Sequence, residues 1–293
     1  MFAIAVLLVL LLVLAGVLVV AAVRPQPEAA LEPGSRLSNV RRRTSRWRWG
    51  GVALGVVFSV SALQVGGTVG RGVMLAAPLF ALGVLVGVIV GELRVAAPSV
   101  AARSAPLEVR RVRDYVPKRL TGAVALAAGT LALLLVATTA AGSPDDVGRA
   151  GRWLVRACSE SLTESRGPWP GSFYSLPLAA VVLSGLAATA FALQQVVRRP
   201  RQGEDVRVDD MLRCNAGSAV VAASGILVAV PLVGASVFAG IALFGSGSAC
   251  PLWWGATVGW ILVGCAACAA VLAVRCIVVL ALPTRTGAGH EVG

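Results

Sequence analysis

Long apolar runs alternate with short, arginine-rich polar segments along the 293 residues of the chain. A helix needs about 20 apolar residues to cross a bilayer, and hydrocarbon leaves no other partner for its backbone amides. The pattern therefore predicts seven helical spans, at residues 2–23, 50–65, 72–91, 120–141, 176–197, 216–244 and 253–274. The second and third spans are separated only by residues 66–71, so they form a tight hairpin or are miscounted.

We expect an all-α fold, with one polytopic transmembrane bundle in residues 1–282 and a flexible cytoplasmic tail in residues 283–293. The first apolar run has no basic residue before it and exceeds the roughly 7–15 apolar residues of a signal peptide. We interpret it as an uncleaved anchor, and a cleaved signal peptide is the alternative.

Lysine and arginine residues predict the orientation of these spans, because short basic loops stay on the cytoplasmic side. If the seven spans are correct, 21 of the 26 basic residues fall on one side and five on the other. The richest segments are residues 24–48 and 92–119, with seven each. We therefore expect the N-terminus outside and the C-terminus inside.

The composition agrees with a membrane protein, since 57% of the residues are hydrophobic and 14% are charged. Soluble domains contain roughly 25% charged residues. The mean hydropathy is +0.82. These values exclude a soluble enzyme, a disordered protein and a disulfide-rich secreted module, and they favour a multi-pass protein of the plasma membrane.

The longest predicted outer loop, residues 142–175, contains a helix-start pattern. Ser143-Pro144-Asp145-Asp146 offers a hydroxyl cap, a first-turn proline and two first-turn carboxylates. Apolar residues then recur every three or four positions. We predict an amphipathic helix at about residues 144–165 on the outer surface, acting as a lid or docking surface or merely covering the ends of the spans.

Cys158 and Cys250 are the two cysteines predicted to lie outside, in an oxidising compartment. They form a disulfide or remain two free thiols, since their separation cannot be read from the sequence. Cys265 and Cys268 lie within the last span, where packing explains them. We identify no catalytic, cofactor-binding or metal-binding residue and expect no cofactor.

Glycines at every fourth position, Gly83, Gly87 and Gly91, give the third span a smooth face. Small residues of this kind allow the backbones of two helices to approach closely. The face either packs within the chain or associates with another membrane protein.

The cytoplasmic loops are basic, and we expect them to contact anionic lipid headgroups of the bilayer. No nucleic-acid-binding module is recognisable, so we expect no nucleic-acid partner. Gly91-Glu92-Leu93 and the segment Val112-Arg113-Asp114-Tyr115-Val116-Pro117 follow one another across the arginine-rich loop.

These two stretches resemble a group of uncharacterised actinobacterial integral membrane proteins. The resemblance covers about 30 residues and implies no known activity. Asp114 and Tyr115 form a cytoplasmic contact point or belong to a turn that fixes the entry of the next helix.

Two functions of different classes fit these observations. The first is a non-enzymatic accessory or regulatory membrane component that acts through helix association. The alternative is a transporter or permease component for an uncharged or weakly polar solute, whose cavity would be lined by polar residues such as Ser59, Ser61, Gln64, Thr130 and Ser224. An enzyme acting on lipids is a third, weaker hypothesis, because no central span contains an ionisable catalytic pair.

Overall fold

The computed structural model describes residues 36–65, 70–94, 111–198, 206–244 and 253–281. They are mostly helical. The elements are α2 (Arg36–Val65), α3 (Arg71–Leu93), η1 (Val112–Asp114), α4 (Lys118–Ala140), β1 (Leu154–Ser159), β2 (Leu162–Arg166), α5 (Ser172–Arg198), α6 (Val206–Phe244) and α7 (Gly255–Ala281).

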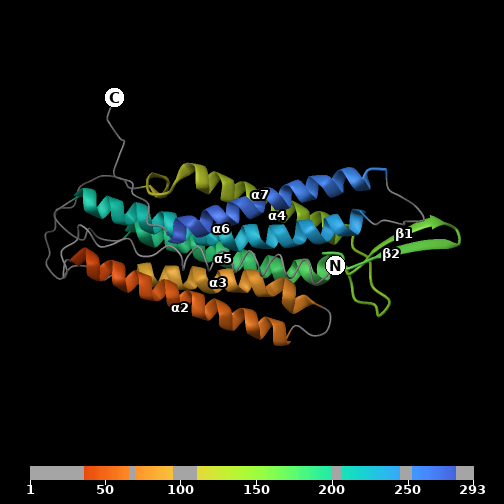
Figure 1. Cartoon of the computed structure of the whole chain (residues 1–293), viewed down its shortest axis with the longest axis horizontal. Helices are drawn as coiled ribbons and strands as arrows, with labels where there is room; N and C mark the ends of the chain where they lie inside the picture. Colours follow the sequence, from red (N-terminus) through yellow and green to blue (C-terminus); the bar gives the residue numbers. More distant parts are fainter. Residues whose placement is uncertain (1–35, 66–69, 95–110, 199–205, 245–252, 282–293) are drawn as a thin grey trace, which may run out of the picture.

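The long helices run side by side, and the strands β1 and β2 lie beyond one end of them (Figure 1). Helix α6 packs against α3, α4, α5 and α7, whereas α2 packs against α3. Small and branched side chains of α6, such as Ala222, Ala223 and Val228, are fully buried. They let the neighbouring helices approach closely, so α6 forms the core of the bundle.

The outer surface of the bundle is apolar. Leu133 of α4, Leu183 of α5 and Val271 of α7 are 71%, 65% and 70% exposed. Contiguous apolar surface on this scale is unfavourable in water. Among the described residues, five helices are long and apolar enough to cross a membrane, namely α3, α4, α5, residues 210–244 of α6 and α7. The chain is therefore built as a membrane-embedded helix bundle.

The seven predicted spans are not all confirmed. Residues 2–23 lie outside the described residues, and residues 50–65 belong to α2, which is not among the five candidates. The apolar part of α2 is shorter than the roughly 20 residues of a full span, and the same helix continues back to Arg36. The other five predicted runs coincide largely with observed helices, although α6 begins ten residues before its predicted start and α7 ends seven residues after its predicted end.

Contacts between helix ends define two ends of the bundle. At the basic end, Arg48 of α2 lies 3.9 Å from Glu92 of α3, and the Arg213 side chain of α6 reaches the end of α5. At the opposite end, which we call the hairpin end, residues 141–171 contact the end of α4, the start of α5 and the end of α6.

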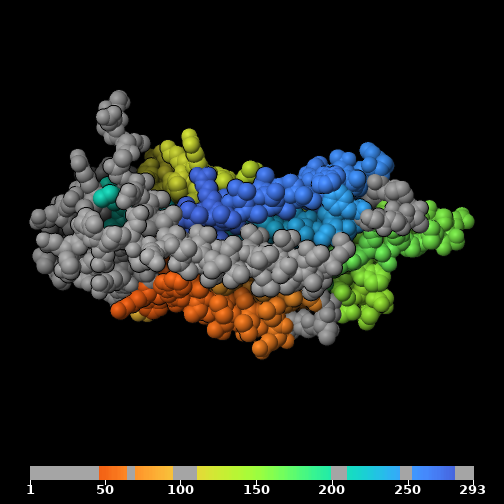
Figure 2. Space-filling model, in the orientation of Figure 1, coloured from red at the N-terminus to blue at the C-terminus, as the bar shows by residue number. Residues whose placement is uncertain are grey.

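The predicted outer helix at residues 144–165 is wrong, although the described chain as a whole is mostly helical, as expected. Residues 154–166 form an antiparallel hairpin, in which Leu154 pairs with Arg166 and Arg156 with Glu164. The register shifts between Ala157 and Ser159, so Cys158 occupies a bulge. In the space-filling view the hairpin projects past the helices (Figure 2).

Two features of this segment explain why it forms a hairpin and not a helix. Gly148 and Gly151 adopt positive φ angles of 80° and 73°, which interrupt a helix and suit a turn. Burial in β1 alternates residue by residue, with Leu154, Arg156 and Cys158 on the less exposed face. Over so short a segment, the apolar residues fit the spacing of a helix and that of a strand about equally well. The glycine turns that precede the segment favour the strand.

Helices α2 and α3 pack backbone against backbone through their glycines. A Cβ atom on Gly51 would lie 2.7 Å from the Cα atom of Gly87, and one on Gly87 would lie 2.6 Å from the carbonyl oxygen of Trp47. A Cβ on Gly83 would lie 2.5 Å from the Cα atom of Gly55. Gly83 and Gly87 are thus occupied by α2 of the same chain, and Gly91 is buried in the same helix.

Candidate functional site

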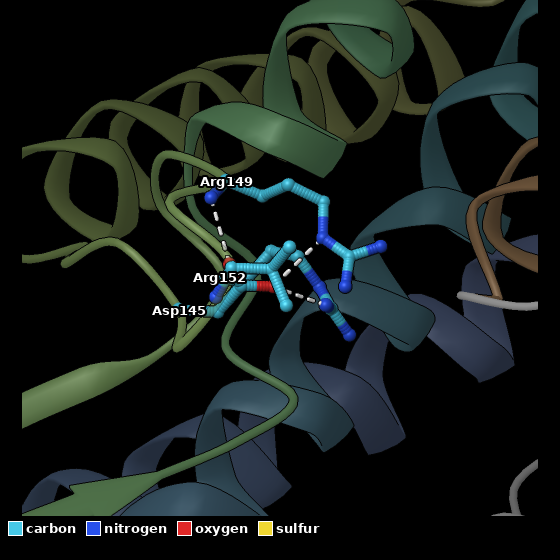
Figure 3. A network of polar contacts seen from close by, with 4 residues as sticks. Asp145, Arg149 and Arg152 are labelled. Carbon is cyan, nitrogen blue, oxygen red and sulfur yellow. Dashed lines mark hydrogen bonds and ion pairs between the residues drawn. The ribbon is translucent and has the colours of Figure 1, made fainter.

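Asp145 organises the loop that leads into the hairpin. Its side chain has no exposed surface. One carboxylate oxygen accepts hydrogen bonds from the backbone N–H groups of Val147 and Arg149, at 3.1 and 2.7 Å. The other accepts from Nε of Arg149 at 2.9 Å and from Nη1 of Arg152. Figure 3 shows both arginines directed at this carboxylate.

The charge of Asp145 is stabilised by these donors. Burial by itself raises the pKa of the carboxyl group, but the hydrogen bonds from Arg149, Arg152 and Val147 outweigh burial and lower this pKa to about 2. The group therefore remains ionised at any physiological pH.

The backbone around Asp145 folds into a tight turn. Its carbonyl oxygen accepts from the N–H of Gly148 at 3.0 Å, while its own N–H donates to the carbonyl of Arg149 at 3.0 Å. Aspartate at the first position and glycine at the fourth are typical of a type I turn, and the bond from Asp145 to the N–H of Val147 is that of an Asx turn.

Arg152 joins this turn to the start of α5. Its guanidinium carbon lies 5.6 Å from the centre of the Phe173 ring, and that of Arg71 lies 5.1 Å from the same ring. Burial lowers the pKa of Arg152, but its hydrogen bonds with Tyr174 and Asp145 outweigh burial and raise it. Arg152 therefore stays positively charged within a partly buried aromatic setting.

A second polar cluster attaches the hairpin to α6. Glu164 accepts from Nε and Nη2 of Arg166 at 2.9 and 2.6 Å and lies 3.5 Å from Nη2 of Arg156 on the opposite strand. Arg166 also donates to the carbonyl oxygen of Ala242 at 3.3 Å. The hairpin is thereby fixed to the last turn of α6.

A cavity of about 420 Å³ lies between the hairpin and the helix ends. Its walls come from α3, the two loops that flank the hairpin, β2, α5 and α6. They comprise Gly70, Val73, Met74, Arg152, Trp153, Ser165, Gly167, Pro168, Trp169, Pro170, Tyr174 and Phe238. Trp169 is held there by a hydrogen bond of 2.7 Å from Nε1 to the carbonyl of Thr138. The cavity is thus aromatic, with Arg152 as the charged residue of its described lining.

The structure separates the residues that the sequence singled out. Cys158 is disulfide-bonded and lies at the hairpin end, whereas Cys214, Cys265, Cys268 and Cys276 are free. Cys250 lies outside the described residues, so the pairing of Cys158 with Cys250 stays a prediction.

Asp114 and Tyr115 lie at the basic end. Asp114 accepts a hydrogen bond from the backbone N–H of Arg111 at 3.3 Å and so closes the short helix η1. The Tyr115 hydroxyl lies 3.4 Å from a carboxylate oxygen of Asp210 on α6. The first contact belongs to a turn before α4, and the second joins that turn to α6. A contact point for another molecule stays a hypothesis.

Arg213 has a role that the sequence did not reveal. We expected it in a basic cytoplasmic loop, but it belongs to α6 and is 1% exposed. Its guanidinium group donates to the carbonyl oxygens of Val196 and Val197 at 3.0 and 3.2 Å. Backbone carbonyls at the end of a helix carry partial negative charge, which stabilises a cation there.

The sequence also missed the cavity and the role of Asp145. The spacing Asp145-x-x-Gly148 is a signal that could have indicated a turn in place of a helix start. No comparable signal connects Phe238 with Trp153, because only the fold brings α6 to the loop before β1.

Comparisons with known proteins add no relative, since no known family, curated protein or solved structure matches the chain. The resemblance to uncharacterised actinobacterial membrane proteins therefore stays a prediction.

Proposed function

We propose that this protein is a non-enzymatic accessory or regulatory component of the plasma membrane, and that it associates with a membrane protein partner through its hairpin end. The observation that carries the proposal is the construction of that end. The hairpin beyond the bundle contains a disulfide-bonded Cys158 and is held by two ion-pair clusters, one of them around the buried carboxylate of Asp145. Because these contacts already fix the hairpin, its chain would lose little conformational entropy on binding a partner.

The packing of α3 makes its glycine face less suited to binding a partner than the hairpin end. Because Gly51 and Gly55 of α2 cover Gly83 and Gly87, the glycine face is used within the chain. The proposal therefore shifts the contact with a partner from the helix faces to the hairpin end.

Transport of a weakly polar solute is the alternative, and the polar residues of the spans support it less well. Ser59, Thr130 and Ser224 donate hydrogen bonds to helix carbonyls at 2.7, 2.9 and 2.8 Å. Ser61 and Gln64 lie exposed on α2. None of the five lines the cavity at the hairpin end.

We also propose seven spans, with residues 2–23 and 50–65 added to the five candidates, and with the hairpin end outside. The support is the 21 to 5 division of basic residues between the two sides in that arrangement. The basic end would then contact anionic headgroups of the cytoplasmic leaflet.

The test is purification of the tagged, full-length protein from its native membranes in a mild detergent. Mass spectrometry and particle mass would be compared for the wild type, Asp145→Asn and Asp146→Asn. Asp145 is buried and Asp146 is exposed in the same turn, so the second variant is a matched control.

We expect a stoichiometric partner in the wild type and in Asp146→Asn, and its loss in Asp145→Asn. A particle with the mass of one chain and no partner would contradict the association proposal. A partner retained equally in all three would show that it does not bind at the hairpin end.

A further inference from the structure

The cavity at the hairpin end has the size and lining of a ligand site. Its volume of about 420 Å³ falls within the roughly 300–1,000 Å³ of small-molecule pockets. Trp153, Trp169, Tyr174 and Phe238 form aromatic walls around Arg152. Pockets that combine apolar walls with one or two polar groups orient a ligand by the polar group and retain it by the apolar surface.

The charge around the cavity is positive. One carboxylate, that of Asp145, serves the two guanidinium groups of Arg149 and Arg152, and Arg71 shares the Phe173 ring with Arg152. Nε of Arg152 is buried without a hydrogen-bond partner in the part of the chain that the structure describes. A guanidinium group has five donors in a planar fork that matches carboxylate and phosphate oxygens.

The start of α3 adds to this positive potential. Gly70, which precedes α3, and Val73, which lies in its first turn, both line the cavity. The N-cap residue Gly70 provides no side-chain cap, and the first turn contains no acidic residue. The N-terminus of a helix carries a partial positive charge that favours an anion.

We propose that this cavity binds an amphiphilic anion, whose phosphate or carboxylate group pairs with Arg152 and whose apolar part lies against the aromatic walls. Two sources share this chemistry, a lipid of the bilayer and a soluble amphiphile. The inference goes beyond the association function, because a ligand of this kind binds whether or not a protein partner is present.

The experiment uses full-length protein in phosphatidylcholine nanodiscs, titrated with octyl phosphate while tryptophan fluorescence is recorded. Trp153 and Trp169 line the cavity, so occupancy changes the emission. Octyl glucoside, with the same chain and no charge, is the ligand control. Partition into the bilayer gives a signal that does not saturate, whereas the cavity saturates.

Two pairs of variants locate the site. Ser165→Phe places a ring on a residue of β2 that lines the cavity, and Thr163→Phe places it on an exposed residue of the same strand outside the lining. Arg152→Lys keeps a positive charge near Asp145 but loses the planar fork. Arg149→Lys makes the same change at the other arginine paired with Asp145, which does not line the cavity. Circular dichroism and thermal midpoints confirm that each variant folds.

We expect saturable binding of octyl phosphate that weakens about tenfold or more in Ser165→Phe and Arg152→Lys, since hydrogen bonds to charged groups are strong. The other two variants should bind as the wild type does. An equal, saturable response to octyl glucoside would overturn the proposal. So would the absence of saturation with octyl phosphate, or unchanged affinity in Ser165→Phe.

Nanodiscs that contain phosphatidylglycerol distinguish the two sources. If a bilayer lipid occupies the cavity, phosphatidylglycerol competes and weakens the apparent affinity for octyl phosphate. If a soluble amphiphile is the natural ligand, the apparent affinity is unchanged.

Discussion

The Asp145 carboxylate accepts hydrogen bonds from two backbone N–H groups and two guanidinium groups. A buried carboxylate with so many charged and backbone donors is stable only while all of them stay in place. The loop between α4 and β1 therefore depends on one side chain, whereas its neighbour Asp146 is exposed.

Asp145→Asn should loosen the hairpin end without unfolding the helices. The amide keeps the shape of the carboxylate but loses its charge, and its NH₂ group faces a donor. We expect amide exchange in residues 143–171 to become about tenfold faster or more, because a buried donor left unpaired is costly. Hydrogen exchange followed by mass spectrometry measures this, with Asp146→Asn as the control. Equal protection in both variants would contradict the role assigned to Asp145.

Acid should act through the same carboxyl group. Its pKa is lowered from 3.8 in a model compound to about 2, so the ionised form stabilises the folded state. This stabilisation is complete above about pH 5 and is lost as the pH falls through the folded pKa. The thermal midpoint of the wild type should therefore approach that of Asp145→Asn between about pH 5 and pH 1. A constant difference between the two across this range would contradict the prediction.

Asp145 also shows what the sequence could and could not predict about single residues. Ser143-Pro144-Asp145-Asp146 satisfies the rules for a helix start and for a turn equally well, and we selected the helix. The disulfide state of Cys158 was one of two open outcomes. The burial of Arg213 could not be predicted, because no residue near it in the sequence indicates that α6 begins seven residues earlier.

Among the elements, the long helices were predictable and the short strands were not. Residues 72–91 and 176–197 were predicted as helical runs, and the helices observed are Arg71–Leu93 and Ser172–Arg198. A continuous apolar run of this length forms a helix in a membrane, because its backbone polar groups must be hydrogen-bonded within the segment. A hairpin of 13 residues, 154–166, contains too few periods to distinguish a strand from a helix, and its partner contacts on α6 are distant in sequence.

The pairing of α2 with α3 is tested by Gly87→Leu. A leucine at this position meets the backbone of Gly51 and Trp47, which cannot move away as a flexible side chain does. We expect a loss of about 3 kcal/mol in the free energy of unfolding or separation of α2 from α3, measured as a lower thermal midpoint and easier proteolysis between them. Gly129→Leu is the control, since a Cβ at Gly129 has no neighbour within 4 Å. Similar effects of both variants would contradict the close packing.

For the molecule as a membrane protein, the division of charge between its two ends makes the strongest prediction. Arg48, Arg94, Arg113 and Arg119 are among the described residues near the basic end. At the hairpin end, Arg149, Arg152, Arg156 and Arg166 all pair with carboxylates. The positive-inside rule counts unpaired and paired basic residues alike, but the pairing explains how arginines are accommodated at the hairpin end.

Cysteine labelling tests this orientation. Asp146→Cys places a thiol on an exposed residue of the hairpin end, and Arg113→Cys places one on an exposed residue of the basic end. In intact cells a membrane-impermeant maleimide should label the first and not the second, and after permeabilisation it should label both. The wild type supplies the background from the native cysteines. Labelling of Arg113→Cys alone in intact cells would reverse the proposed orientation.

The bond from Arg166 to the carbonyl of Ala242 spans 76 residues of sequence. Ribosomes add about 5–20 residues per second, so the acceptor emerges roughly 4–15 s after its donor. During that interval α6 is still incomplete, and the hairpin end has its internal pairs and its contacts with α4 and α5, but not its contact with α6. The contact between the hairpin and α6 is therefore among the last to form at this end during biosynthesis, and it requires that the α6 segment is already in place.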